Sequence, residues 1–227
     1  NLATGDVIDF VQILGNVLDI GQPSDDTVTA AKINNDVISG QTELAATPAD
    51  TDELLISDAG TIKRIDFSHL KTGITMADQW RVTSATSFGS SVADITGFEQ
   101  IDTTGQGTLG TAMSESSGIF TFPQTGIYLV TANISAYRSG DARYVNLFIK
   151  GTTNNSSYST FAQSYDSIEQ AESNSTYANV ITSTFVDVTD TSNVKVKFSI
   201  RATQDCYFKG SSTDNENSFT FIRLGDT

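Results

Sequence analysis

The sequence GIFTFPQTGIYLVTANI, residues 118–134, contains two apolar runs separated by a Pro-x-x-Gly turn. Side chains alternate in both runs, and a period of two predicts β-strands, because successive side chains leave a strand on opposite sides. After the turn, both alternating sets begin with bulky residues, Tyr128 and Val130 on one face and Ile127 and Leu129 on the other. A strand with one face in water would not need both sets. We therefore expect one face to fill the domain core and the other to meet another subunit; the alternative is burial of both faces within one chain.

The composition favours an acidic β-protein with many turns. The 227 residues include 13 lysines and arginines against 27 aspartates and glutamates, a net charge of −14. A surface this acidic repels phosphate backbones and anionic lipid, so no nucleic-acid partner is expected. No apolar run reaches the roughly 18 residues of a membrane-spanning helix, so no membrane insertion is expected. The single cysteine, Cys206, excludes an intrachain disulfide and a cysteine-based zinc site within one chain.

Residues 1–76 are expected to form an N-terminal anchor or stalk. They carry 12 acidic and 4 basic side chains and few aromatic residues. The apolar cluster between Val7 and Ile20 fits a short helix or two strands. Residues 27–40, TVTAAKINNDVISG, cannot close a core alone; such segments become stable when several copies or chains wrap round a common axis. The chain starts at Asn1 without a methionine, so we interpret it as a piece of something longer.

Residues 51–70, TDELLISDAGTIKRIDFSHL, predict a β-hairpin. Strands over 54–56 and 61–67 flank a turn in which Asp58 is favoured and Gly60 supplies a left-handed backbone position. Ser68 is expected to cap a short helical turn that follows the second strand.

Residues 77–227 are expected to form one compact β-domain. Short alternating runs separated by Gly, Ser, Asn and Asp clusters are typical of a β-sandwich. The polar insert 151–176 is expected to be a surface loop, where binding specificity usually resides. The predicted strands cover residues 80–84, 99–102, 118–122, 126–137, 144–150, 178–188, 193–202, 205–209 and 218–224.

Two sets of apolar side chains are candidates for contact with partners. On the last strand, Phe219 and Phe221 share one face while Ile222 and Leu224 share the other, so one of the two faces is expected to be shared between subunits. Exposed aromatic residues among Ser, Asn and Gln suit the recognition of sugars or proteins, although packing of the insert against its own sandwich would explain them equally well. The candidates for the subunit interface are Ile127, Leu129, Phe219 and Phe221, and those for receptor contact are Tyr158, Phe161 and Tyr165, with Tyr177 nearby.

The C-terminal residues resemble the C1q/tumour-necrosis-factor (TNF)-like jelly-roll family. The family pattern is an aromatic-x-x-Pro-x-x-Gly-x-Tyr run and a last strand rich in Phe and Leu. It is matched by Phe120, Pro123, Gly126, Tyr128 and Val130, and at the end by Phe219, Phe221 and Leu224, with Thr220 where the family usually has glycine. The likeness covers roughly 110 to 150 residues. It implies an all-β jelly-roll sandwich in an obligate homotrimer without catalytic activity.

The N-terminal part is similar to something else. DTVTAAKI, followed by the DELLISDAGTIKRIDFSHL segment, resembles fibre and appendage proteins of tailed bacteriophages. This likeness implies a trimeric phage fibre or capsid decoration protein on the surface of the virion. Its N-terminal region would bind other virion proteins of the capsid or tail, and its jelly-roll head would touch a host glycan or envelope protein.

No residue set in the sequence carries a recognisable catalytic centre. His69 is the only histidine, and the geometry of the neighbouring Ser68 does not suit a nucleophile. Calcium needs six to eight oxygen ligands, and two acidic clusters could supply some of them, although solvated loop carboxylates are the default interpretation. No cofactor is therefore expected. The calcium candidates are Asp50, Asp52 and Glu53, and separately Asp214, Asn215 and Glu216.

The sequence thus predicts a non-enzymatic, homotrimeric structural appendage of a virion. A secreted C1q-like trimeric ligand or lectin is the alternative from another class. A glycan depolymerase of the tailspike kind would require a long parallel β-helix of repeated rungs, and these residues contain no such repeats.

Overall fold

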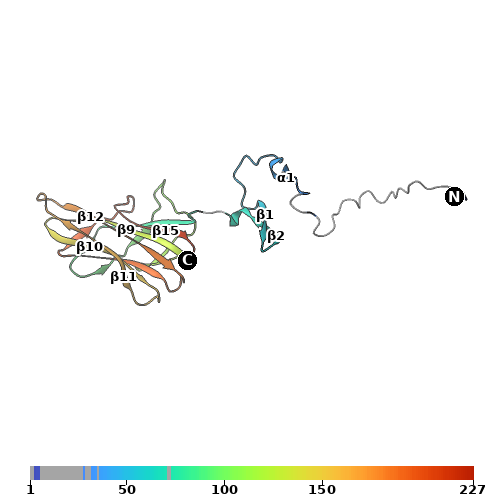
Figure 1. Ribbon diagram of the computed structural model, residues 1–227. Helices are drawn as coiled ribbons and strands as arrows, with labels where there is room; N and C mark the ends of the chain where they lie inside the picture. Colours follow the sequence, from blue (N-terminus) through green and yellow to red (C-terminus); the bar gives the residue numbers. More distant parts are fainter. Residues whose placement is uncertain (1–2, 6–27, 29–31, 35, 71–72) are drawn as a thin grey trace. The chain divides into compact units, whose positions relative to one another are not determined.

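The computed structural model describes residues 3–5, 28, 32–34, 36–70 and 73–227 (Figure 1). The chain divides into two compact units, Asn1–Lys71 and Thr72–Thr227, which are treated separately below. The apolar cluster between Val7 and Ile20 lies outside the described residues. Met76, counted above with the N-terminal region, is the first residue of a strand in the second unit and is buried in its core.

The predicted hairpin is confirmed in the N-terminal unit. Strands β1 (Glu53–Asp58) and β2 (Thr61–Asp66) pair antiparallel, with Asp58 opposite Thr61. The two turn residues between them both have positive φ, 49° at Ala59 and 86° at Gly60, which matches the right-handed twist of the flanking strands. Among its described residues this unit also contains the helix α1 (Asp36–Ser39) and the 3-10 turn η3 (Phe67–His69).

The helical turn after the hairpin begins earlier than expected. Its N-cap residue is Asp66, with no side-chain capping hydrogen bond, so the expected cap at Ser68 is wrong. The backbone supplies the link instead, because the amide of Phe67 donates to the carbonyl oxygen of Asp52 at 2.7 Å.

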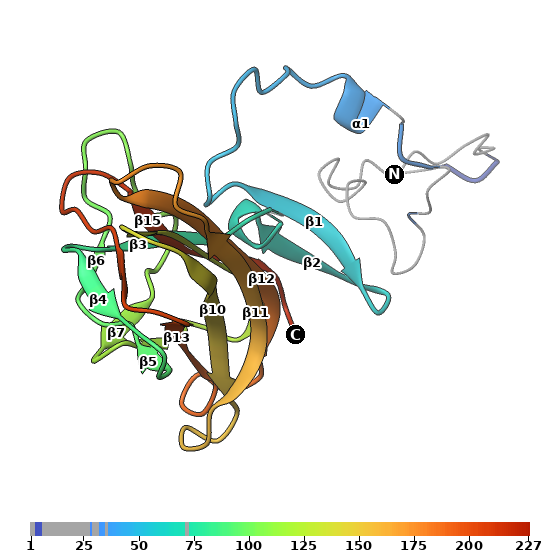
Figure 2. The same cartoon turned by 90° about the vertical axis from the view of Figure 1, so that its left-hand side faces the viewer.

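The second unit is an antiparallel β-sandwich of two sheets (Figure 2). In sheet I the strand order is β4-β14-β9-β15-β3-β6, with β12 paired to the full length of β9. In sheet II the order is β11-β10-β13-β8-β7, with β5 paired to β13. Strands β11 and β12 lie next to each other and connect the two sheets along one side.

The strand bounds are as follows. Sheet I contains β3 (Met76–Val82), β4 (Thr86–Phe88), β6 (Phe98–Gln100), β9 (Gly126–Arg138), β12 (Thr176–Val188), β14 (Cys206–Phe208) and β15 (Asn217–Gly225). Sheet II contains β5 (Ala93–Asp94), β7 (Ser114–Ser116), β8 (Ile119–Thr121), β10 (Ala142–Thr152), β11 (Ser159–Ile168) and β13 (Lys195–Ala202).

One sequence expectation about the strands of this unit is wrong. The insert 151–176 is not a single surface loop, because the ten residues of β11 lie within it and form an edge of sheet II against β10. The short strands β4, β5 and β7 were not expected either. They have two or three residues each, too few for an alternating pattern to be recognised.

Aromatic rings fill the space between the sheets. Phe198 of sheet II lies 4.6 Å from Phe219 of sheet I, and Phe120 lies 5.0 Å from Phe221, between ring centroids. All four rings are fully buried. The turn before β9 needs its glycine, because Gly126 has φ +140° and a Cβ there would overlap the carbonyl oxygen of Gly225. The residues that suggested the fold therefore lie at its centre.

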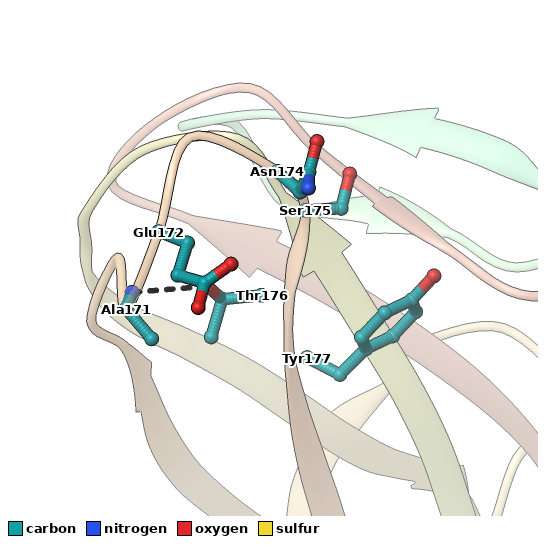
Figure 3. A pocket seen from close by; sticks show the side chains of 6 residues that line it. All are labelled: Ala171, Glu172, Asn174, Ser175, Thr176 and Tyr177. Atoms are coloured by element: carbon teal, nitrogen blue, oxygen red, sulfur yellow. Dashed lines mark hydrogen bonds between the residues drawn. The ribbon is translucent and has the colours of Figure 1, made fainter.

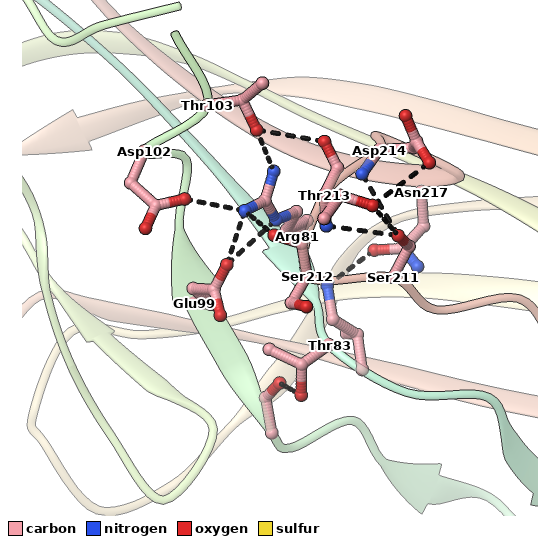
Figure 4. Close-up of polar contacts among 12 residues, drawn as sticks. Arg81, Thr83, Glu99, Asp102, Thr103, Ser211, Ser212, Thr213, Asp214 and Asn217 are labelled. Atoms are coloured by element: carbon pink, nitrogen blue, oxygen red, sulfur yellow. Dashed lines mark hydrogen bonds and ion pairs between the residues drawn. The ribbon is translucent and has the colours of Figure 1, made fainter.

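Two buried charged side chains hold the loops at one end of the sandwich. The carboxylate of Asp78 accepts hydrogen bonds from the indole of Trp80 at 2.8 Å and from the amide of Met113 at 2.9 Å. Arg81 donates to Glu99, Asp102, Thr103 and the carbonyl oxygen of Ser212 (Figure 4). Because the guanidinium joins β6 to the loop that precedes β15, it fixes segments that are more than a hundred residues apart in the sequence.

Candidate interaction surfaces of the jelly roll

The outward side of sheet I carries an apolar face. We use this name for Ile127 and Leu129 of β9, Ile181 and Phe185 of β12, and Ile222 of β15. The strand register places Leu129 directly between Phe185 and Ile222, and Phe185 and Ile181 are 67% and 53% exposed. Cross-strand neighbours on one side of a sheet touch one another, so Phe185, Leu129 and Ile222 form one patch, with Ile127 next along β9. Ile181 lies opposite Asn133, beyond the pair Ser183 and Thr131. Soluble chains rarely leave such a patch in water unless it binds something.

On the same side of sheet I, a row of polar side chains lies next to the apolar face. The amide of Gln79 donates to the hydroxyl of Thr220 at 2.7 Å, and Thr131 lies opposite Thr220. Asn133 is one step further along β9, and its buried Oδ1 has no hydrogen-bond partner among the described residues. An unpaired buried acceptor costs free energy, so it favours a partner that brings a donor to this layer.

Three tyrosines continue this side of sheet I toward the end of β9. Tyr137 lies between Tyr177 and Tyr207, with ring centroids 5.4 Å and 5.6 Å away. The ammonium of Lys209 lies 5.5 Å from the Tyr137 centroid and 5.6 Å from that of Tyr177. A pocket adjoins each end of the row. One is lined by residues 171–172 and 174–177, among which the amide of Ala171 donates a hydrogen bond to the hydroxyl of Thr176 (Figure 3). The other is lined by Ser87, Phe88, Gly89, Asp205 and Tyr207.

The structure separates the four residues expected at a subunit interface into two pairs. Ile127 and Leu129 point outward from sheet I and are partly exposed, so they remain available to a partner. Phe219 and Phe221 are fully buried among the rings of the protomer's own core. A ring that its own chain covers completely has no surface to share, so the expectation for these two residues is wrong. The outward side of β15 presents Thr220, Ile222 and Leu224 instead.

Two of the three receptor-contact candidates, Phe161 and Tyr165, lie on β11, and Tyr158 lies in the loop directly before it. Tyr165 is 53% exposed and Phe161 is 37% exposed. The ring of Phe161 covers Gly151, where no Cβ would fit. Tyr158 precedes the strand, and the ammonium of Lys197 lies 4.6 Å from its ring centroid. Burial, followed by the nearby charge of Asp94, raises the pKa of the Tyr158 phenol, so this hydroxyl stays protonated at neutral pH.

The outward side of sheet II carries cations in place of aliphatic side chains. We call the set Lys150, Lys195, Lys197 and Arg201 the basic face. Lys150 of β10 lies opposite Lys197 of β13, and Thr152 lies opposite Lys195. Arg201 lies opposite Asn146, which in turn pairs with Tyr165 of β11. The alternation that sends Val196, Phe198 and Ile200 into the core therefore sends these cations outward.

One carboxylate borders the basic face. Asp94 accepts a hydrogen bond from Lys197 at 2.7 Å and another from Ser199 at 2.6 Å. Burial raises the pKa of Asp94, but these two hydrogen bonds and the charges of Lys197 and Lys150 outweigh it, so the pKa lies below its usual value. The carboxylate is thus charged at neutral pH and neutralises part of the face at its β5 edge.

The described residues contain no metal-binding constellation. Among them, no three His, Cys, Asp or Glu side chains lie close enough together to hold an ion. His69 is exposed at the end of η3, and Asp52 uses its carboxylate to accept the amide of Ala49 at 2.9 Å. Cys206 is a buried free thiol whose pKa is raised by burial. Within the part of the chain that the structure describes, no helix is long and apolar enough to cross a membrane.

Comparison with known proteins bears on the fold. The sequence matches no protein-family model and no curated protein. The structure of Eiger TNF from S. frugiperda is similar with a TM-score of 0.52 and 14% identity, covering 68% of this chain and 96% of that one. Murine APRIL gives a TM-score of 0.49 at 13% identity, covering 66% of this chain and 98% of the other. The fold is a TNF-like jelly roll. At this level of identity the likeness extends to the arrangement of strands and no further.

Proposed function

We propose that this chain is a homotrimeric, non-enzymatic appendage of a virus particle, whose jelly roll associates through the apolar face and whose N-terminal region attaches it to other virion proteins. The observation that carries the trimer is the exposed, largely apolar outward side of β9, β12 and β15, on which Asp187 of β12 lies opposite Ile127. None of the outward residues of β9 from Ile127 to Tyr137 is charged, and charge is what usually keeps an exposed sheet face monomeric.

The energetics favour self-association. Covering the exposed side chains of Ile181 and Phe185 contributes about 1 to 2 kcal/mol each, and Leu129, Ile222 and Ile127 add smaller amounts. Each protomer of a trimer makes two such contacts, so the gain is repeated at every interface. Donors from a neighbouring copy would also satisfy the unpaired Oδ1 of Asn133. Together these terms can exceed the association cost, which is about 4 to 15 kcal/mol.

The proposal that the chain belongs to a virion rests on different observations from the proposal that it forms a trimer. It rests on the resemblance of residues 26–70 to phage fibre and appendage proteins and on the acidic N-terminal region, which carries 12 of the 27 acidic residues. The confirmed hairpin β1-β2 lies within that segment. Its outward residues Leu55 and Ile62 are 79% and 75% exposed, so the hairpin offers apolar contacts to an attachment partner.

Light scattering on the full chain tests the assembly. The expected mass at micromolar concentration is three times the 24.3 kDa of one chain. Phe185→Asp should give the mass of one chain, because three buried carboxylates would meet at the contact. Tyr165→Asp, at an exposed aromatic position on sheet II, is the matched control and should remain trimeric. A monomeric wild-type chain would refute the trimer, and a trimeric Phe185→Asp variant would refute the assigned face.

The location of the protein separates the virion proposal from the secreted-ligand alternative, since both predict a trimer. The chain should be recovered by mass spectrometry from gradient-purified particles of the virus whose genome encodes it. Immunogold labelling should place it at the particle surface. Recovery from the culture medium alone, with none in the particles, would favour the secreted ligand.

A further inference from the structure

We propose that the basic face binds an acidic polysaccharide, with Arg201, Lys150 and Lys197 pairing with its carboxylate or sulfate groups and Tyr165 stacking on its sugar rings. This inference rests on the host-contacting role proposed for the jelly roll and names the class of ligand.

The first argument is the concentration of positive charge. Residues 72–227 contain nine lysines and arginines, and four of them make up the basic face. The register brings Lys150 and Lys197 side by side on neighbouring strands, while Lys195 and Arg201 extend the row along β13. At about 3.4 Å per residue, these β13 cations span roughly 20 Å. A linear anionic polymer can contact such a row at several points, whereas a small anion could use only one or two.

The second argument is that aromatic rings hold the cations in place. The guanidinium of Arg201 lies 5.6 Å from the ring centroids of both Tyr144 and Phe148. The ammonium of Lys150 lies 5.5 Å from the centroid of Phe148. Phe148 points outward from sheet II yet is only 6% exposed. Cations stacked in this way lose less side-chain freedom on binding, which favours affinity.

The third argument is unused hydrogen-bonding capacity. Within the described residues, Lys150 and Arg201 form no ion pair, and the Nε of Arg201 has no acceptor. Asn146 is fully buried beside it in the register; its amide nitrogen donates to the carbonyl oxygen of Ser164 at 3.0 Å, but its Oδ1 has no donor. An unpaired donor and an unpaired acceptor on adjacent strands suit a ligand that carries both anionic oxygens and hydroxyl groups.

The fourth argument concerns which partner the face fits. A second copy of the chain would bring the same four cations, which repel one another, so self-association through this face is disfavoured. The exposed ring of Tyr165, which lies 5.6 Å from Tyr144 in an edge-on arrangement, offers an apolar surface to the C–H groups of a sugar. Charge and stacking together favour an acidic polysaccharide.

Titration of the full chain with fluorescent dextran sulfate, polygalacturonate and unmodified dextran tests the proposal. We expect binding of at least one of the two acidic polymers at low salt, a dissociation constant that rises at least tenfold between 50 mM and 200 mM salt, and no binding of dextran. Equal binding of neutral dextran, or no binding of either acidic polymer, would overturn the proposal.

Matched variants locate the site. Lys150→Gln combined with Arg201→Gln should weaken binding of the acidic polymer at least tenfold. Combining Lys150→Gln with Arg201→Lys instead should restore part of the lost affinity. Lys209→Gln removes a charge from the opposite sheet and should change the dissociation constant less than twofold. Equal effects of Lys209→Gln and of the double variant would overturn the assignment to the basic face. Light scattering on each variant separates these outcomes from failure of the trimer, because the basic-face variants should keep the wild-type mass.

Discussion

The two outward sides of the sandwich differ more than its two inward sides. Both sheets send Phe, Val and Ile into a common core, and the rings of Phe198 and Phe219 meet there at 4.6 Å. On the outside, sheet I presents Ile181, Phe185 and partly exposed aliphatic residues, whereas sheet II presents Lys150, Lys197 and Arg201. Inward residues therefore account for the fold, and outward residues distinguish one jelly roll from another.

The two sheets also differ in the burial and pairing of their outward cations. Arg81 follows Ala77 and Gln79 on the alternation of β3 that faces away from the core, but loops cover it entirely. On sheet II the charged groups of Lys150 and Arg201 form no ion pair among the described residues. A covered, paired cation stabilises the chain, and an uncovered, unpaired one is available to a ligand. Removing the covered Arg81 should therefore lower the stability of the chain, whereas removing Lys150 or Arg201 should weaken the binding of a ligand.

The largest expected effect lies on β15, where one strand separates the core from the apolar face. In a Phe185→Asp background, which should keep the chain monomeric, Phe221→Ala should lower the free energy of unfolding by about 3 to 5 kcal/mol, because the cavity lies among packed rings. Ile222→Ala in the same background should lower it by less than about 1 kcal/mol. Urea denaturation measures both. Similar losses of unfolding free energy for the two variants would mean that Phe221 and Ile222 do not lie in different environments, one in the core and the other on the apolar face.

A smaller effect is expected at the covered cation of sheet I. Arg81→Met removes the hydrogen bonds to Thr103 and Ser212 and the ion pairs with Glu99 and Asp102. Because the side chain of Asp102 is 77% exposed and can return to water, the expected loss is about 2 kcal/mol, less than for a fully buried pair. Hydrogen exchange should increase over residues 99–103 and 211–214. Arg143→Met, at an exposed cation, should change neither the free energy of unfolding nor hydrogen exchange. If hydrogen exchange in Arg81→Met equalled that of the wild type, Arg81 would not hold these loops in place.

The sequence predicted the parts of the fold that depend on local alternation. The run from Gly126 to Tyr137 and the hairpin around Ala59 and Gly60 were predicted because their pattern or turn chemistry is complete within a few residues. β11 was missed because STFAQSYDSI carries few apolar residues; its position is determined by backbone pairing with β10, the strand that precedes it. An edge strand needs little apolar pattern of its own.

The candidate sites were predicted less completely, for a related reason. Alternation separates Phe219 and Phe221 from Ile222, but it does not say which set faces the core; that depends on the rings contributed by Phe120 and Phe198. The cations of β13 alternate visibly in the sequence. Their meeting with Lys150 and Tyr165 depends on the register of three strands, which no local pattern determines.

The smallest expected effect concerns the one carboxylate that borders the basic face. Because the pKa of Asp94 is lowered in the folded chain, its charge contributes stability above its unfolded pKa of about 3.9, and this contribution is lost as pH falls through the folded value. Asp94→Asn should therefore lower stability at pH 7 by less than about 1 kcal/mol, since the pair is partly exposed. It should also flatten the dependence of stability on pH below about 4.

The same substitution distinguishes two roles of Asp94: neutralising Lys197 and positioning it. Without Asp94, the ammonium of Lys197 loses its counter-charge, although it keeps the ring of Tyr158 at 4.6 Å. If the basic face binds anionic polymers, Asp94→Asn should tighten the binding of dextran sulfate a few-fold while slightly destabilising the chain. Weaker binding would mean that Asp94 serves to position Lys197 rather than to neutralise it. Because stability and binding are expected to change in opposite directions, thermal unfolding and polymer titration of this one variant separate a structural carboxylate from one that limits the charge of the face.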